Sequence, residues 1–213
     1  MAVYVVVIGP PGAGKGTQAI KLSETLQITH VSTGELFRGN IRDGTELGKR
    51  VDAVLSRGEL VSDELTIALV RDRLEQLDCE RGAVMDGFPR TAEQAQALDE
   101  ILDDDGDCVM LAPYIHVTDK VIIERLTGRR VDARTGETYH VKYNPPPHGL
   151  EVEQRLDDCQ ETVQTRIDEY HKNTASMLAH YTDRGVLQEF DGEQPINVLT
   201  DQLLAALEDR RSR

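Results

Sequence analysis

The stretch from Gly9 to Gln18, GPPGAGKGTQ, has the composition of a phosphate-binding loop. Its glycines allow several backbone N–H groups to converge on phosphate oxygens, and Lys15 adds a full positive charge. The preceding run, VYVVVIG, is apolar and rich in β-branched residues, which favours a strand buried on both faces of a parallel sheet. The following run, GKGTQAIKLSETL, places apolar side chains at helical spacing. A glycine loop between a strand and a helix is the context that binds nucleotide phosphates.

One position of this loop departs from the common pattern G-x-x-x-x-G-K-[ST]. Gly16 stands where that pattern has a hydroxyl for magnesium, and Thr17 follows it. The form G-x-P-G-x-G-K-G-T resembles the nucleoside monophosphate kinases, above all the adenylate kinase family, in which glycine follows the lysine. In that family the magnesium ion is held largely through water and the nucleotide phosphates, so the resemblance accounts for the missing hydroxyl.

Further segments resemble the motifs of this family in the same order along nearly the whole chain. They are STGELFR (32–38), ELVSDEL (59–65), MDGFPR with Gln94 beyond it, GRRVDARTGETYHVKYNPP (128–146) and RLDDCQETVQTRIDEYH (155–171). The resemblance implies a P-loop α/β fold, with helices on both faces of about five parallel strands. It also implies a division into a core (1–31, 62–127 and 159–213), a helical AMP-binding lobe (32–61) and a hairpin lid (128–158).

The family reaction is the reversible transfer of the terminal phosphoryl group of ATP to AMP, which gives two ADP. The acceptor phosphate needs no deprotonation near neutral pH, so catalysis depends on positioning and charge neutralisation. Planar guanidinium groups suit this task. The resemblance implies that one lysine and five arginines are catalytic: Lys15, Arg90, Arg125, Arg129, Arg155 and Arg166.

The resemblance also assigns residues to the two nucleotides. The ATP-binding set is Gly12, Ala13, Gly14, Lys15, Gly16, Thr17, Arg125, Arg129, Thr138 and Tyr139. The AMP-binding set is Thr33, Arg38, Glu59, Leu60, Val61, Gly87, Arg90, Gln94, Arg155 and Arg166.

Asp86 follows an apolar run and resembles the family carboxylate that orients magnesium-bound water; its plainer interpretation is an aspartate that caps a turn. Mg²⁺ with ATP is therefore the expected cofactor. Some members of the family hold the lid with cysteines on zinc. Asp132 and Thr135 stand at the first two of those positions, and we expect no zinc.

Gln94 has two competing interpretations. Its amide can recognise adenine, but Thr91 and Gln94 also fit a T-x-x-Q capping box at a helix start. We favour adenine recognition. The alternatives are a kinase acting on UMP or CMP, a GTP:AMP phosphotransferase, and a nucleotide-binding regulator that has lost catalysis.

Strands alternate with helices along the rest of the chain, which predicts a parallel sheet. The predicted helices are 65–76, 91–102 with Thr91 as N-cap, 118–126 with Thr118 as N-cap, 157–183 and 196–208. Further strands are predicted at 82–87, 108–117 and 186–190. Between 128 and 158 the rhythm breaks, and a turn near Gly136 predicts a small hairpin.

The formal net charge of −14 argues against nucleic acid or an anionic membrane as a partner. The composition, poor in lysine, fits a salt-adapted protein or an ordinary acidic one. The sequence has three widely spaced cysteines and lacks a recognisable leader or a run of roughly 18 apolar residues. We expect a cytoplasmic monomer whose partners are ATP, AMP and ADP.

Overall fold

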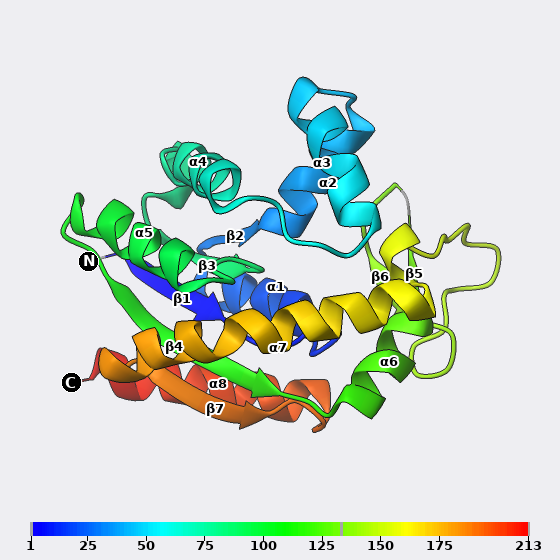
Figure 1. Ribbon diagram of the computed structural model, residues 1–213. Helices are drawn as coiled ribbons and strands as arrows, with labels where there is room; N and C mark the ends of the chain where they lie inside the picture. The colour runs from blue at the N-terminus through cyan, green and yellow to red at the C-terminus, as the bar shows by residue number, and fades with distance from the viewer. Residues whose placement is uncertain (1, 133, 213) are drawn as a thin grey trace.

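Five parallel strands form the central sheet of the computed structural model, which describes residues 2–132 and 134–212 (Figure 1). The strand order is β2-β3-β1-β4-β7, and the strands are β1 (Val3–Val7), β2 (Thr29–Ser32), β3 (Gly82–Asp86), β4 (Val109–His116) and β7 (Leu187–Asp191). Met1, Ala133 and Arg213 fall in the ranges predicted for the core and lid and lie outside the described residues.

β1 occupies the middle of the sheet and is buried along its whole length. Val3, Val5 and Val7 pack into one hydrophobic core, whereas Tyr4 and Val6 pack into another on the opposite face. This alternation follows from the pleat of a strand covered on both sides.

Helices cover both faces of the sheet. One core includes residues of α1 (Lys15–Leu26), α6 (Asp119–Thr127) and α8 (Ile196–Arg211). The other includes residues of α4 (Asp63–Leu74) and α5 (Ala92–Asp103). The long helix α7 (Gln160–Asp183) contributes Val163 to the first core and Met177 to the second. The predicted three-layer α/β/α fold is therefore confirmed.

A third, smaller hydrophobic cluster lies under α2 (Thr33–Arg42) and α3 (Glu46–Ser56), which stand above the sheet in Figure 1. Its buried members are Phe37, Val51 and Val61. These two helices therefore have apolar packing of their own, apart from the two main cores.

A two-stranded antiparallel hairpin, β5 (Arg129–Val131) and β6 (Thr138–His140), follows α6. Asp132 organises its turn, because the carboxylate accepts hydrogen bonds from the backbone N–H of Arg134 at 2.8 Å and from the Thr135 hydroxyl at 2.9 Å. The chain returns through a short 3₁₀ helix, η2 (Leu156–Asp158), into α7.

The structure corrects some of the predicted elements. Strand β2 was not predicted, because three of its four residues, THVS, are polar and it lies at the sheet edge. Helix α7 begins at Gln160 rather than at 157, since the preceding residues form η2. Thr118 precedes α6, but its hydroxyl donates to Glu193 Oε1 at 2.7 Å and makes no cap hydrogen bond.

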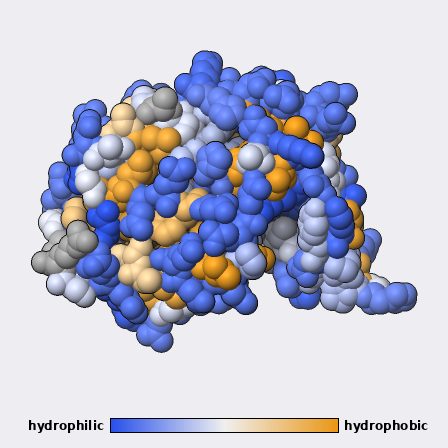
Figure 2. Space-filling view, turned by 90° about the horizontal axis from the view of Figure 1, so that it is seen from below, coloured by the Kyte–Doolittle hydropathy of each residue, from blue (hydrophilic) through white to orange (hydrophobic). Residues whose placement is uncertain are grey.

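The surface seen from below is mostly hydrophilic, with separate apolar patches (Figure 2). No helix in the described part of the chain combines the length and the apolar character that crossing a membrane would require.

The contact between α2 and α3 generates a stability prediction. A Cβ atom on Gly48 would lie 2.1 Å from the carbonyl oxygen of Asn40, so Gly48→Ala must push the two helices apart. We expect it to lower the free energy of unfolding by about 1–3 kcal/mol, as overpacking does, in denaturant titrations followed by circular dichroism.

Gly39→Ala is the matched control, because Gly39 also lies in α2 and a Cβ there would meet nothing within 4 Å. It should leave stability unchanged or raise it by about 0.5–1 kcal/mol through helix propensity. Equal destabilisation by both changes would show that the close approach at Gly48 is not what matters.

Candidate active site

The phosphate-binding loop joins β1 to α1 at the carboxyl end of the sheet. Gly14 is the N-cap residue of α1 and has φ +92°, a conformation that glycine adopts at little cost. The first backbone N–H groups of α1 therefore open toward an anion without a side-chain cap in front of them. The Lys15 ammonium is held over the loop by hydrogen bonds to the carbonyls of Gly9 and Pro10, both at 2.8 Å.

The space beside Gly16 is taken by a carboxylate from another strand. A Cβ atom on Gly16 would lie 3.2 Å from Asp86 Oδ2, at the end of β3. The Ser32 hydroxyl donates to the same oxygen at 3.3 Å, and His30 Nε2 is 3.7 Å from it. A serine or threonine at position 16 would crowd this carboxylate, so the absent hydroxyl and the present aspartate are two aspects of one arrangement.

The charges of the loop and of Asp86 depend on each other. Desolvation lowers the pKa of Lys15 to about 7; Asp86 opposes this effect, and Arg90 adds to it. Desolvation alone would raise the pKa of Asp86, but His30, Lys15 and Arg90 together hold it below its ordinary value. The site therefore keeps an ionised carboxylate next to a lysine whose protonated form an incoming anion would stabilise.

Five of the predicted arginines lie in one electrostatically coupled cluster beside Lys15. They are Arg38, Arg90, Arg129, Arg155 and Arg166. Loss of water in the cleft lowers the pKa of Arg90, although this side chain still reaches solvent, and the charge of Arg166 lowers it further. The pKa of Arg155 is lowered in the same way, with Arg129 adding to the desolvation. Such crowding of cations is a signature of a site for a multiply charged anion.

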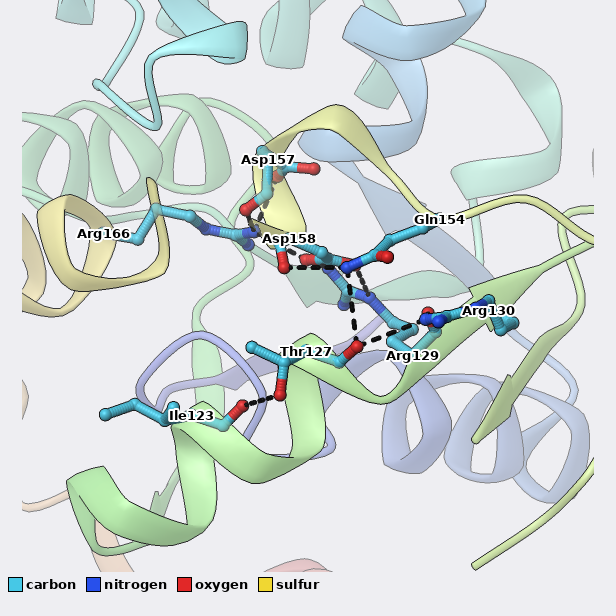
Figure 3. A network of polar contacts seen from close by, with 8 residues as sticks. All are labelled: Ile123, Thr127, Arg129, Arg130, Gln154, Asp157, Asp158 and Arg166. Carbon is cyan, nitrogen blue, oxygen red and sulfur yellow. Dashed lines mark hydrogen bonds and ion pairs between the residues drawn. The ribbon is translucent and has the colours of Figure 1, made fainter. Parts of the chain in front are cut away.

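Two aspartates of η2 neutralise part of this cluster (Figure 3). Asp158, which is fully buried, accepts a bidentate pair from Arg129 at 2.7 and 2.6 Å. Arg166 Nη1 lies 2.6 Å from Asp157 Oδ2 and 3.3 Å from Asp158 Oδ1. Neither aspartate was predicted as a site residue, although the motif RLDD places an acidic pair two and three residues after Arg155.

Polar contacts also fasten the base of the hairpin to the end of α6. The Gln154 amide donates to the carbonyl of Asp158 at 3.0 Å, and Arg130 Nη1 donates to the carbonyls of Thr127 and Arg129 at 3.2 and 2.6 Å (Figure 3). Arg130 thus serves backbone carbonyls, which distinguishes it from its neighbour Arg129.

A cavity of about 90 Å³ lies between the phosphate-binding loop and α7. Lys15, Arg90 and Arg166 line it together with Leu60 and Gly87. Pockets for ligands of drug size are roughly 300–1,000 Å³. The surrounding segments must therefore separate before a nucleotide can enter.

The residues predicted on the AMP side differ in their surroundings. The Thr33 hydroxyl and Arg90 Nε both donate to the carbonyl of Gly87, at 2.9 and 2.8 Å. Val61 belongs to the small hydrophobic cluster under α2 and α3, and Glu59 forms an exposed pair with Arg57 at 2.8 Å.

Lys15 lines this cavity, whereas the other residues predicted on the ATP side do not; three of them lie outside both the phosphate loop and the arginine cluster. Arg125 Nη2 donates to the carbonyl of Gly192 at 2.9 Å. Thr138 is exposed on the hairpin, and Tyr139 is packed within it with 9% of its surface exposed.

The donors at the site suit a hard cation that brings most of its own ligands. Within residues 2–132 and 134–212, no group of three or more His, Cys, Asp and Glu side chains is placed to hold a metal ion. Asp86 offers one ionised carboxylate beside the phosphate loop. Mg²⁺ commonly binds through one or two carboxylates, water and substrate phosphates, so the residues present fit it.

Residues 7–186 match the family model described as adenylate kinase. The chain belongs to the adenylate kinase family. It is accordingly an enzyme that transfers a phosphoryl group between nucleotides. Curated relatives named adenylate kinase include those of Moorella thermoacetica (47% identical, covering 90% of this chain and 92% of the relative) and Clostridium beijerinckii (47%, covering 91% and 93%). The adenylate kinase of Symbiobacterium thermophilum is 43% identical and covers 98% of this chain and all of its own length.

The buried pair of Asp158 and Arg129 predicts a large effect of Asp158→Asn. The variant leaves the Arg129 guanidinium without its bidentate acceptor in a place where little water can replace it. We expect the free energy of unfolding to fall by about 3 kcal/mol, measured by denaturant titration.

Asp78→Asn is the comparison, since Asp78 forms a similar pair with Arg73 at 2.7 Å but is 55% exposed. That change should cost at most about 1 kcal/mol. A loss for Asp158→Asn no larger than the loss for Asp78→Asn would contradict the importance of burial.

The lowered pKa of Lys15 predicts proton uptake when nucleotide binds. At about pH 8 a group with a pKa near 7 is mostly neutral, and an adjacent phosphate favours its charged form. Titration calorimetry of magnesium-free ATP in buffers of different ionisation enthalpy should therefore detect uptake at about pH 8 and less at about pH 6. Lys15→Met should abolish the difference, and unchanged uptake in that variant would assign the proton to another group.

Proposed function

We propose that this adenylate kinase transfers the terminal phosphoryl group of ATP to AMP by means of the charged cluster described above, and so maintains the balance of adenine nucleotides. The observation that carries this proposal is the convergence of Lys15 with Arg38, Arg90, Arg129, Arg155 and Arg166 from distant parts of the chain. Two nucleotides repel each other through their phosphates, and a concentration of fixed positive charge offsets that repulsion.

In this proposal the phosphate loop and Lys15 bind the donor phosphates. Arg38 and Arg90 hold the phosphate of AMP, and Arg129, Arg155 and Arg166 neutralise the group in transfer. Fixed guanidinium groups hold the reacting oxygens in line, so no side chain has to accept a proton. The pairs with Asp157 and Asp158 keep the arginines oriented before substrate arrives.

Asp86 would hold Mg²⁺ through bound water, next to the phosphate loop. The ion, when bound, neutralises charge on the donor phosphates. The lowered pKa of Asp86 supports this role, because the carboxylate remains ionised throughout the neutral range.

We propose that residues 32–61 and 128–158 move as lobes on a core of residues 1–31, 62–127 and 159–213. The small cavity supports this division, since both lobes must open to admit nucleotides and then close to exclude water. Lid movement would also bring Thr138 and Tyr139 to the ATP side, where they do not line the present cavity, and would close over Arg125 of the core.

On the AMP side, Thr33, Leu60 and Val61 would surround the adenine ring with Gln94. Glu59 and Gly87 would complete that pocket. We further propose that the enzyme acts as a cytoplasmic monomer, and that nucleic acids and membranes are not its partners because its net charge of −14 repels such anions.

Coupled assays of ADP formation test the substrates. With ATP as donor, AMP should be the preferred acceptor over CMP and UMP; with AMP as acceptor, ATP should be preferred over GTP. Arg90→Ala should lower kcat/KM for AMP by at least about a hundredfold, since it removes a charge-assisted contact to the acceptor phosphate. Preference for CMP would replace the acceptor assignment, and full activity of Arg90→Ala would overturn the role of the cluster.

A further inference from the structure

Hydrogen bonds from one carboxylate fasten the start of α4 to the start of α5. Asp63, the first residue of α4, accepts from Gln94 Nε2 at 2.7 Å through Oδ1 and from the Thr91 hydroxyl at 2.8 Å through Oδ2. Gln94 is 2% exposed, so its amide is enclosed by protein. Among the described residues, this amide is hydrogen-bonded to Asp63 of α4 and to the backbone N–H of Arg90, just before α5.

Those partners fix which way round the amide lies. Gln94 Oε1 accepts a hydrogen bond from the backbone N–H of Arg90 at 2.9 Å, while its nitrogen donates to Asp63. A carboxylate can only accept, and a backbone N–H can only donate. The flipped amide would set oxygen against carboxylate and nitrogen against N–H, so only the observed orientation satisfies both neighbours.

The N-cap interaction of α5 does not use the side-chain amide of Gln94. The Thr91 hydroxyl accepts from the backbone N–H of Gln94 at 3.2 Å, which is the threonine half of a capping box. The glutamine half is replaced, because the side chain of Gln94 reaches Asp63 and the N–H of Arg90 instead. Thr91 is therefore the N-cap, as predicted, and Gln94 is free for another task.

The orientation leaves an ordered pair of hydrogen-bonding positions. A primary amide has two N–H donors and an oxygen with two acceptor sites. One donor and one acceptor are used, and the described residues supply no further partner for the amide. The unused donor and acceptor match the edge of adenine, in which a ring nitrogen accepts and the neighbouring amino group donates. Hypoxanthine and guanine have the reverse order, a ring N–H beside a carbonyl oxygen.

We infer that Asp63 is a specificity-determining positioning residue: it holds the Gln94 amide in the order that accepts AMP and rejects 6-oxopurine monophosphates. The inference rests on the proposed function, in which Gln94 contacts the acceptor base. Asp63 comes shortly after Leu60 and Val61 in the same segment, so its bonds also set the distance between those apolar side chains and the amide. The bond between Gln94 and Arg90 ties this base contact to a residue of the phosphate site.

The test compares AMP and IMP as acceptors at saturating MgATP. In Asp63→Leu only the backbone N–H of Arg90 still selects the orientation of the amide, and the flipped form is no longer opposed by a carboxylate. The ratio of kcat/KM for AMP to kcat/KM for IMP should therefore fall by about tenfold or more, with KM for ATP unchanged. Asp63→Asn can still accept from the Gln94 amide and can donate to the Thr91 hydroxyl, so it should keep a ratio close to that of the wild type. Glu64→Leu is the matched control, because Glu64 is exposed on the same turn, and it should keep the wild-type ratio.

A double-mutant cycle separates positioning from packing. If Asp63 acts through Gln94, adding Asp63→Leu to Gln94→Leu leaves the AMP to IMP ratio where Gln94→Leu alone puts it. An independent, additive drop would overturn the inference, and so would a wild-type ratio in Asp63→Leu. Should the leucine variant fail to fold, Asp63→Ala decides, since it also lacks an acceptor for the Gln94 amide and a wild-type ratio there contradicts the inference.

The acceptor preference of the wild-type enzyme separates a failure of the proposed function from a failure of the role of Asp63. If it does not phosphorylate AMP, the proposed function itself fails. If it prefers AMP and both Asp63→Leu and Asp63→Ala keep that preference, only the role of Asp63 fails.

Discussion

Mutual repulsion among positive charges is the constraint around which this molecule is organised. Lys15 and five arginines share a cleft that holds little water. The lowered pKa values of Lys15, Arg90 and Arg155 reflect the free-energy cost of placing like charges together with little solvent. The cluster is tolerable in the folded chain because Asp86, Asp157 and Asp158 lie among the cations. The parallel sheet, the loop at its carboxyl edge and the hairpin each position charged residues of this cluster.

The carboxylates of η2 give the cluster a resting arrangement. Asp158 presents two oxygens to Arg129 much as a phosphate would, so the guanidinium is already in a fixed plane. A nucleotide then meets side chains whose conformational entropy is partly lost beforehand.

Local sequence patterns were sufficient where neighbours along the chain determine the structure. The apolar run of β1, the glycine loop and the spacing of α1 predicted their own conformations, and Thr91 was identified as an N-cap from its own turn. Strand β2 was missed because an edge strand of four mostly polar residues shows no hydrophobic pattern. Family motifs named Arg129 and Arg166, whereas the acidic pair in RLDD does not by itself say which arginines it meets; the pairing with Asp157 and Asp158 depends on tertiary structure. The packing of Tyr139 and the contact of Arg125 with Gly192 likewise depend on tertiary structure.

The closeness of Gly16 to Asp86 has a consequence for the divergence of such loops. A Cβ atom at position 16 would lie 3.2 Å from Asp86 Oδ2, so a side chain there requires the carboxylate to shift, and the space open to each residue depends on the other. A lineage that gained a hydroxyl at this position would also have to reposition the residue at 86. The two residues, one in the first turn of α1 and the other at the end of β3, should therefore covary as a linked pair rather than drift separately.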